Sequence, residues 1–118
     1  MKRLIFIISL LFTISCDDII EVPDISSETI TILAPTDDVT LTTTSVTFSW
    51  DIVEDTDMYR LQIATPNFVT AQQILVDSLT FDLSIMKTLE VGEYEWRLRG
   101  ENSDFQTEYT TQRFTIEE

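Results

Sequence analysis

The stretch from residue 89 to residue 100, LEVGEYEWRLRG, constrains the fold of this chain more than any other. Within it, Tyr94, Trp96 and Leu98 alternate with charged residues. Successive side chains of a β-strand point to opposite faces, so a period of two puts the apolar side chains on one face and the charges on the other. Gly92, just before the alternation, is typical of a turn or tight corner. The stretch therefore predicts a strand with one buried and one solvated face.

Short segments with the same period recur along the chain. They predict inward-facing side chains at Val46, Phe48 and Trp50, at Tyr59, Leu61 and Ile63, at Leu79, Phe81 and Leu83, and at Phe114 and Ile116. Further short strands are expected at residues 29–34, an edge strand that ends at Pro35, and at residues 74–77. Turns or loops are expected at residues 36–38, 51–57, 66–67 and 100–107, and one helical turn at residues 84–88.

The order of these segments predicts the fold class. Strands follow one another at short spacing, and no long segment has the 3.6-residue period of an amphipathic helix. We therefore expect an all-β domain over residues 29–118, a Greek-key β-sandwich of about seven strands. The tryptophans and the inward tyrosines are expected in its core rather than on a sugar-stacking surface.

Several of these residues resemble a fibronectin type III domain. The resemblance is carried by Trp50 at the end of one strand, Tyr59 at the start of the next, and Leu89, Gly92 and Tyr94 at the corner. A tyrosine after such a corner buries its ring and returns its hydroxyl to nearby backbone, an arrangement called the tyrosine corner. The string YEWRLRGEN is also similar to the YxWRVRAxN of such domains in bacterial surface proteins. The resemblance implies a fibronectin type III-like, immunoglobulin-like sandwich over residues 29–118, and it says little about function.

Residues 1–15 predict a signal peptide. Lys2 and Arg3 form a positive start, and residues 4–14 are mostly apolar but too few for a membrane span, which needs about 20. Ser15-Cys16 resembles the lipobox of bacterial lipoproteins, which implies that the signal is removed and that Cys16 is diacylated. The alternatives are an ordinary signal peptide with an incidental cysteine, or an uncleaved anchor. Cys16 is the only cysteine, so the chain has no internal disulfide.

Residues 16–28 predict an acidic tether that starts at the lipidated cysteine, because they contain acids, Pro23 and serines without either period. Asp17 and Asp18 resemble the surface-export signal of Bacteroidota lipoproteins, although a generic acidic linker accounts for them equally well. The sequence thus predicts a Bacteroidota-type lipoprotein, held to the outer membrane through Cys16, on its periplasmic or cell-surface face.

The charge balance excludes some partners. The chain has 7 basic and 21 acidic residues, a net charge of −14, and removal of Lys2 and Arg3 leaves five basic residues and a net charge of −16. Such a balance argues against binding of nucleic acid or of an anionic membrane surface. Acids in the 51–57 loop could ligate calcium, but the EF-hand spacing is absent, so no metal site is assigned.

No catalytic constellation is visible in the sequence. The chain has no histidine, which excludes Ser-His-Asp and Cys-His arrangements and ordinary zinc sites. It has two glycines and no phosphate-binding loop. Its acids lie mostly in loops and on solvated faces, where nothing raises a pKa. We therefore expect a non-enzymatic protein without a cofactor, and a small hydrolase is the least favoured hypothesis.

Four arginines form the main candidate binding surface. The strand register directs Arg60, Arg97, Arg99 and Arg113 away from the core, and in a fibronectin-type sandwich their three strands lie side by side. Two interpretations stay open, namely cross-strand ion pairs with acids on that face, or a docking surface for a carboxylate-bearing partner.

Two aromatic residues in or beside the last loop are further binding candidates. Phe105 is expected to be exposed near the middle of the 100–107 loop, and Tyr109 follows it. The alternative is a local cluster that packs the loop onto the sheet.

The sequence thus predicts a lipid-anchored cell-envelope protein that acts as a binding or accessory module for a protein or a glycan. The alternative is a structural spacer or small subunit of an outer-membrane complex with no ligand of its own.

Overall fold

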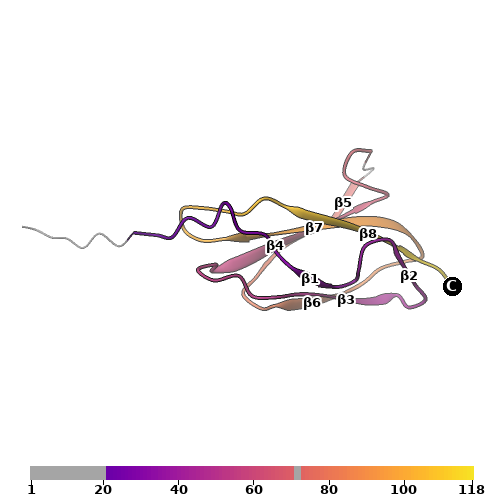
Figure 1. Cartoon of the computed structure of the whole chain (residues 1–118). Coiled ribbons are helices and arrows are strands. Elements are labelled where there is room, and N and C mark those ends of the chain that lie inside the picture. Colours follow the sequence, from indigo (N-terminus) through magenta and orange to yellow (C-terminus); the bar gives the residue numbers. More distant parts are fainter. Residues whose placement is uncertain (1–20, 71–72) are drawn as a thin grey trace, which may run out of the picture.

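The computed structural model describes residues 21–70 and 73–118, so Cys16 and the predicted signal peptide lie outside the described residues. Every element in this part of the chain is a strand, and the strands form two sheets that face each other (Figure 1). The three-stranded sheet has the order β1 (Ile32–Ala34), β3 (Ser45–Trp50) and β6 (Ser84–Thr88). The five-stranded sheet has the order β2 (Val39–Leu41), β8 (Thr110–Ile116), β7 (Gly92–Glu101), β4 (Met58–Thr65) and β5 (Gln73–Thr80).

The strand count corrects the sequence-based expectation, since the described residues form eight strands instead of seven. The expectation missed β2, a three-residue strand that pairs in parallel with β8. The helical turn expected at residues 84–88 is wrong, because these residues form β6 and pair with β3. The expected edge position of residues 29–34 is confirmed by β1, which is the first strand of its sheet.

The expected inward strand with Leu79, Phe81 and Leu83 is also wrong. β5 continues from Gln73 to Thr80, and residues 81–83 form the bend that leads into β6. Leu79 pairs with Arg60 and therefore shares the outward face of the sheet, while Phe81 is 77% exposed in the bend. The alternation of apolar residues gave a wrong prediction here because it runs through an edge strand and a turn. In such segments a period of two does not show which side chains are buried.

Aromatic side chains from both sheets meet in the core. All the other positions expected to face inward are buried, and the two tryptophans are fully so. Phe48 on β3 packs edge-on against Trp96 on β7, with ring centroids 4.8 Å apart, and against Phe114 on β8, at 5.8 Å. Trp50 and Tyr59 form a second contact between the sheets, at 5.6 Å. Aromatic pairs at these distances add to the free energy gained from burial alone.

The tyrosine corner is confirmed. The Tyr94 hydroxyl donates a hydrogen bond of 2.6 Å to the backbone oxygen of Glu90, and the Tyr94 ring stacks on Phe114 at 5.3 Å. One side chain thus joins the turn before β7 to the core, and this fixes where β7 begins.

Removing the Tyr94 hydroxyl tests the corner. We expect Tyr94→Phe to lower the free energy of unfolding by about 1–1.5 kcal/mol, because the backbone oxygen of Glu90 loses its partner while the ring contact with Phe114 stays. Urea denaturation checks the value. Tyr109→Phe is the control, since no hydrogen bond of the Tyr109 hydroxyl occurs among the described residues, and its stability should match that of the wild type. Equal stability of both variants would contradict the role of the corner.

The segment before β1 packs against one end of the sandwich. Ile25 is buried, and the Asn102 side-chain nitrogen donates to the backbone oxygens of Pro23, at 2.9 Å, and Asp55, at 3.1 Å. Residues 21–28, which the sequence assigns to the tether, therefore include a part that contacts the domain at the 51–57 and 102–105 turns.

Candidate binding face

The outward face of the five-stranded sheet brings the four predicted arginines together. In the register of β4, β7 and β8, Arg60 lies opposite Arg99, Gln62 opposite Arg97, and Glu95 opposite Arg113. Directly opposed residues share a face of a sheet. We call these four arginines, with the side chains that contact them, the arginine face.

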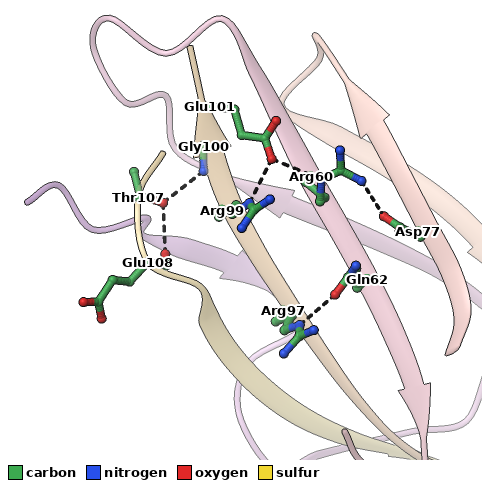
Figure 2. Close-up of polar contacts among 9 residues, drawn as sticks. All are labelled: Arg60, Gln62, Asp77, Arg97, Arg99, Gly100, Glu101, Thr107 and Glu108. Carbon is green, nitrogen blue, oxygen red and sulfur yellow. Dashed lines mark hydrogen bonds and ion pairs between the residues drawn. The ribbon is translucent and has the colours of Figure 1, made fainter. Parts of the chain in front are cut away.

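Arg60 and Arg99 share one carboxylate, as Figure 2 shows. Glu101 Oε2 accepts from Arg99 Nε at 2.8 Å and from Arg60 Nε at 3.1 Å, and a terminal nitrogen of Arg60 also reaches Asp77 at 2.8 Å. Burial alone would raise the pKa of Glu101, but the hydrogen bonds from the two arginines outweigh burial and lower it. The two ion pairs of Arg60 are cross-strand, as one of the two interpretations expects, whereas the Arg99–Glu101 pair lies within β7.

Arg97 has different surroundings. Its Nε donates to Gln62 Oε1 at 2.8 Å, and its guanidinium carbon lies 4.1 Å from the centre of the Phe68 ring and 4.3 Å from that of Tyr109. Arg99 also lies over Tyr109, at 4.7 Å. Within residues 21–70 and 73–118, no carboxylate oxygen is within ion-pair distance of Arg97. The positive charge of Arg97 is therefore held by aromatic faces and a neutral amide.

Two neighbours hold the aromatic rings in place. The Phe68 backbone N–H donates to Glu95 Oε1 at 2.9 Å, which fixes the β4–β5 connection over β7. Thr107 is buried, accepts from the Gly100 N–H at 3.0 Å and donates to the Glu108 backbone oxygen at 2.9 Å (Figure 2). These hydrogen bonds of Thr107 turn the chain back along β7, so that the Tyr109 ring lies against Arg97 and Arg99.

Arg113 lies at the margin of the face. Its Nε is 3.8 Å from Asp38, and the two side chains are 63% and 71% exposed. An ion pair so open to water contributes little to stability. Arg113 thus shares the face without belonging to the network of the other three arginines.

The two aromatic candidates, Phe105 and Tyr109, lie in different surroundings. Tyr109 belongs to the arginine face, whereas no arginine of the described residues lies over the ring of Phe105. Phe105 was expected to be exposed but is half-buried, in a turn held by Asn102, whose Oδ1 accepts from the Asp104 and Phe105 backbone N–H groups. The sequence analysis also missed Phe68, because it lies in a connection without strand period and nothing in the sequence places it near Arg97.

The described residues contain neither a metal-binding cluster nor a membrane-spanning helix. In the part of the chain that the structure describes, no three histidine, cysteine, aspartate or glutamate side chains are grouped so that they could hold a metal ion. In the same residues, no helix has the length and apolar character needed to cross a membrane.

Solved structures are similar to this chain in fold. Fibronectin(III)-like modules of Clostridium thermocellum CbhA match at a TM-score of 0.55 and 6% identity, over 75% of this chain and 96% of theirs. FN3tt matches at a TM-score of 0.54 and 12% identity, over 73% of this chain and 91% of its own. A fibronectin type III domain of the human KIAA0970 protein matches at a TM-score of 0.53 and 12% identity, over 74% of this chain and 72% of its own. No family model and no curated protein matches the sequence.

The fold is fibronectin type III-like. Its two facing sheets have the architecture of an immunoglobulin-like β-sandwich. At these identities the likeness concerns the fold alone.

A glutamine at position 101 tests the ion-pair group. We expect Glu101→Gln to lower the free energy of unfolding at neutral pH by about 1 kcal/mol, because two part-exposed ion pairs of about 0.2–1 kcal/mol each are lost. A lowered pKa stabilises the fold above the ordinary carboxyl value of 4.5, and the effect disappears as pH falls through the folded-state pKa. The stability difference between the wild type and the variant should therefore shrink in acid.

Urea denaturation at neutral pH and at about pH 2.5 measures this difference. The control is Glu54→Gln, an exposed acid without an ion pair among the described residues, which should change stability little at either pH. A difference for Glu101→Gln that is the same at both pH values would show that the carboxylate charge is not responsible.

Proposed function

We propose that this protein is a non-enzymatic, lipid-anchored module of the bacterial cell envelope that binds a protein or glycan partner through the arginine face. Cys16 holds it to the outer membrane of a Bacteroidota-type cell, on the periplasmic or cell-surface side. We infer from Arg97 that the partner carries a carboxylate group.

The environment of Arg97 is the observation that carries the proposal. Two rings and Gln62 hold the guanidinium, while no acid of the described residues neutralises it. Only Nε of this guanidinium is hydrogen-bonded among the described residues, so its terminal nitrogens have no hydrogen-bond partner there. A guanidinium with free terminal N–H groups can grip a carboxylate in a bidentate way, and a side chain already held in position loses less entropy on binding.

The rest of the molecule supports such a role. Arg60 and Arg99 are satisfied by Glu101 and Asp77, so they stabilise the face without needing a partner. All arginines after the signal peptide lie on this one face of a chain whose net charge is −14. An acidic body repels an acidic partner that approaches elsewhere and thereby favours one orientation.

The anchor is tested by Cys16→Ala. We expect this change to move the protein from the membrane fraction to the soluble or secreted fraction, because each buried CH₂ of an acyl chain contributes about 0.8 kcal/mol and several chains act together. Fractionation followed by a high-salt wash measures the shift. A variant that still pellets with membranes after the wash would rule out lipid anchoring at this cysteine.

The arginine face is tested with a panel of immobilised neutral glycans, uronate-bearing glycans and glutamate-rich peptides. We expect binding to a carboxylate-bearing member of the panel, and Arg97→Gln should weaken it about tenfold, as loss of a charge-assisted bidentate contact implies. Arg97→Lys keeps the charge but loses the planar fork, so it should restore only part of the affinity.

Lys87→Gln is the matched control, because Lys87 is the one basic residue after the signal peptide that lies in the other sheet. It should leave binding unchanged. If no panel member binds, or if Arg97→Gln and Lys87→Gln have the same effect, the docking role of the face is wrong and a structural spacer is favoured.

A further inference from the structure

The free edge of β5 is a second candidate surface, which adjoins the arginine face at Asp77. β5 is the last strand of the five-stranded sheet, and no strand of the described residues pairs with its other side. It has eight residues, whereas the edge strands β1 and β2 have three each and β6 has five. Natural edge strands are usually kept short or carry lysine or proline, which prevents pairing with other chains. β5 carries neither residue.

A bulge shortens the regular part of this edge without removing it. The register with β4 shifts between Ile63 and Ala64, which leaves Leu75 as the extra residue on β5. From Val76 to Thr80 the pairing with β4 is regular. Five consecutive residues therefore present an extended backbone whose outer hydrogen-bonding groups have no strand partner among the described residues.

At residues 78–80 of β5, polar side chains face inward and an apolar side chain faces outward, which is the reverse of the usual arrangement. Ser78 and Thr80 pair with the core residues Leu61 and Tyr59 and so share their inward face. Leu79 pairs with Arg60 on the outward face and is 47% exposed. Leu79 thus adds apolar area to the outward side of this edge.

Exposed apolar side chains are concentrated in one stretch of the chain. Of the ten large apolar side chains exposed in the described residues, six lie between residues 74 and 86, namely Ile74, Leu75, Leu79, Phe81, Leu83 and Met86. They follow β5, the bend after it and the start of β6. A groove of about 590 Å³ adjoins them, between Leu75 and Val76 of β5 and the 88–92 turn.

Charge marks the two ends of the edge. Asp77, in its middle, is neutralised by Arg60 at 2.8 Å. Asp82 lies in the bend just beyond β5, and Glu90 lines the groove at the other end. Both acids are exposed, and neither has an ion pair among the described residues. The edge thus has no net charge in its middle, where Arg60 pairs with Asp77, and is negative at both ends.

We infer that the edge of β5 docks an extended segment of another protein, which adds a strand to the five-stranded sheet. Main-chain hydrogen bonds to Val76–Thr80 hold the segment, and apolar side chains on its outward face cover Leu79. A basic residue at each end of the segment pairs with Asp82 and Glu90. A second copy of this chain is a poorer occupant, because its β5 has no basic residue to meet these acids and both copies are strongly acidic.

The test uses the full-length protein, purified in detergent, and a library of random peptides about as long as β5 displayed on phage. We expect selected peptides to alternate apolar and polar residues and to carry lysine or arginine at both ends. Binding of their synthetic forms should fall about tenfold or more for Leu79→Lys and for the double change Asp82→Asn with Glu90→Gln. The bound peptide should also slow amide hydrogen exchange at Val76–Thr80.

The control is Ile52→Lys, a change of the same kind at an exposed apolar residue in the 51–57 loop, which should bind the peptides as the wild type does. The inference fails if no peptide is enriched, if the enriched peptides bind Leu79→Lys and Ile52→Lys equally, or if their binding leaves exchange at β5 unchanged. It also fails if sedimentation shows a dimer that Leu79→Lys dissociates, because the occupant is then a second copy.

Discussion

The contact between Trp96 and Phe48 joins the two sheets, and the outward surface depends on it. β7 lies between β4 and β8, so the inward position of Trp96 also determines which side chains of its neighbours face outward. A slip of one residue would bury Arg97 without a partner, at a large cost in free energy. The aromatic core is not free of cost, since the indole nitrogens of Trp50 and Trp96 are buried without a hydrogen-bond partner among the described residues. Aromatic packing therefore outweighs two unsatisfied donors, each worth about 1–3 kcal/mol.

The parts of the fold that could be predicted from sequence are those where one face of a strand is fully buried. Val46 to Trp50, Tyr59 to Ile63 and Tyr94 to Leu98 lie in or across the core, so their period of two reports burial directly. β2 could not be predicted, because three residues are too short for a period to show. Along β5 and its bend, Leu79 and Phe81 satisfied the pattern while facing solvent, since an edge strand has only one neighbouring strand. The pattern fails where burial is incomplete.

The candidate sites differ in how they could be found. The shared outward face of the four arginines follows from alternation, but the neutralisation of Arg60 and Arg99 depends on side-chain conformations across three strands. The Phe68 contact depends on a loop conformation, for which no local pattern exists. The two surfaces also differ in kind. An arginine held between aromatic rings recognises a particular group, here a carboxylate. A free strand edge gains affinity from main-chain hydrogen bonds and specificity from alternate side chains.

The hydrogen bond from Asn102 to the backbone oxygen of Pro23 shortens the tether between the proposed anchor and the domain. With Ile25 buried and Pro23 held, about six residues separate Cys16 from the domain, a reach of about 20 Å when extended. The amino-terminal segment leaves at one end of the sandwich, and the carboxyl terminus lies at the other (Figure 1). The acidic 51–57 loop would then face the lipid surface, and negative headgroups would repel it. If Cys16 is the anchor, a domain tied so short and repelled in this way would stand upright, with both sheets turned sideways toward its neighbours in the membrane plane.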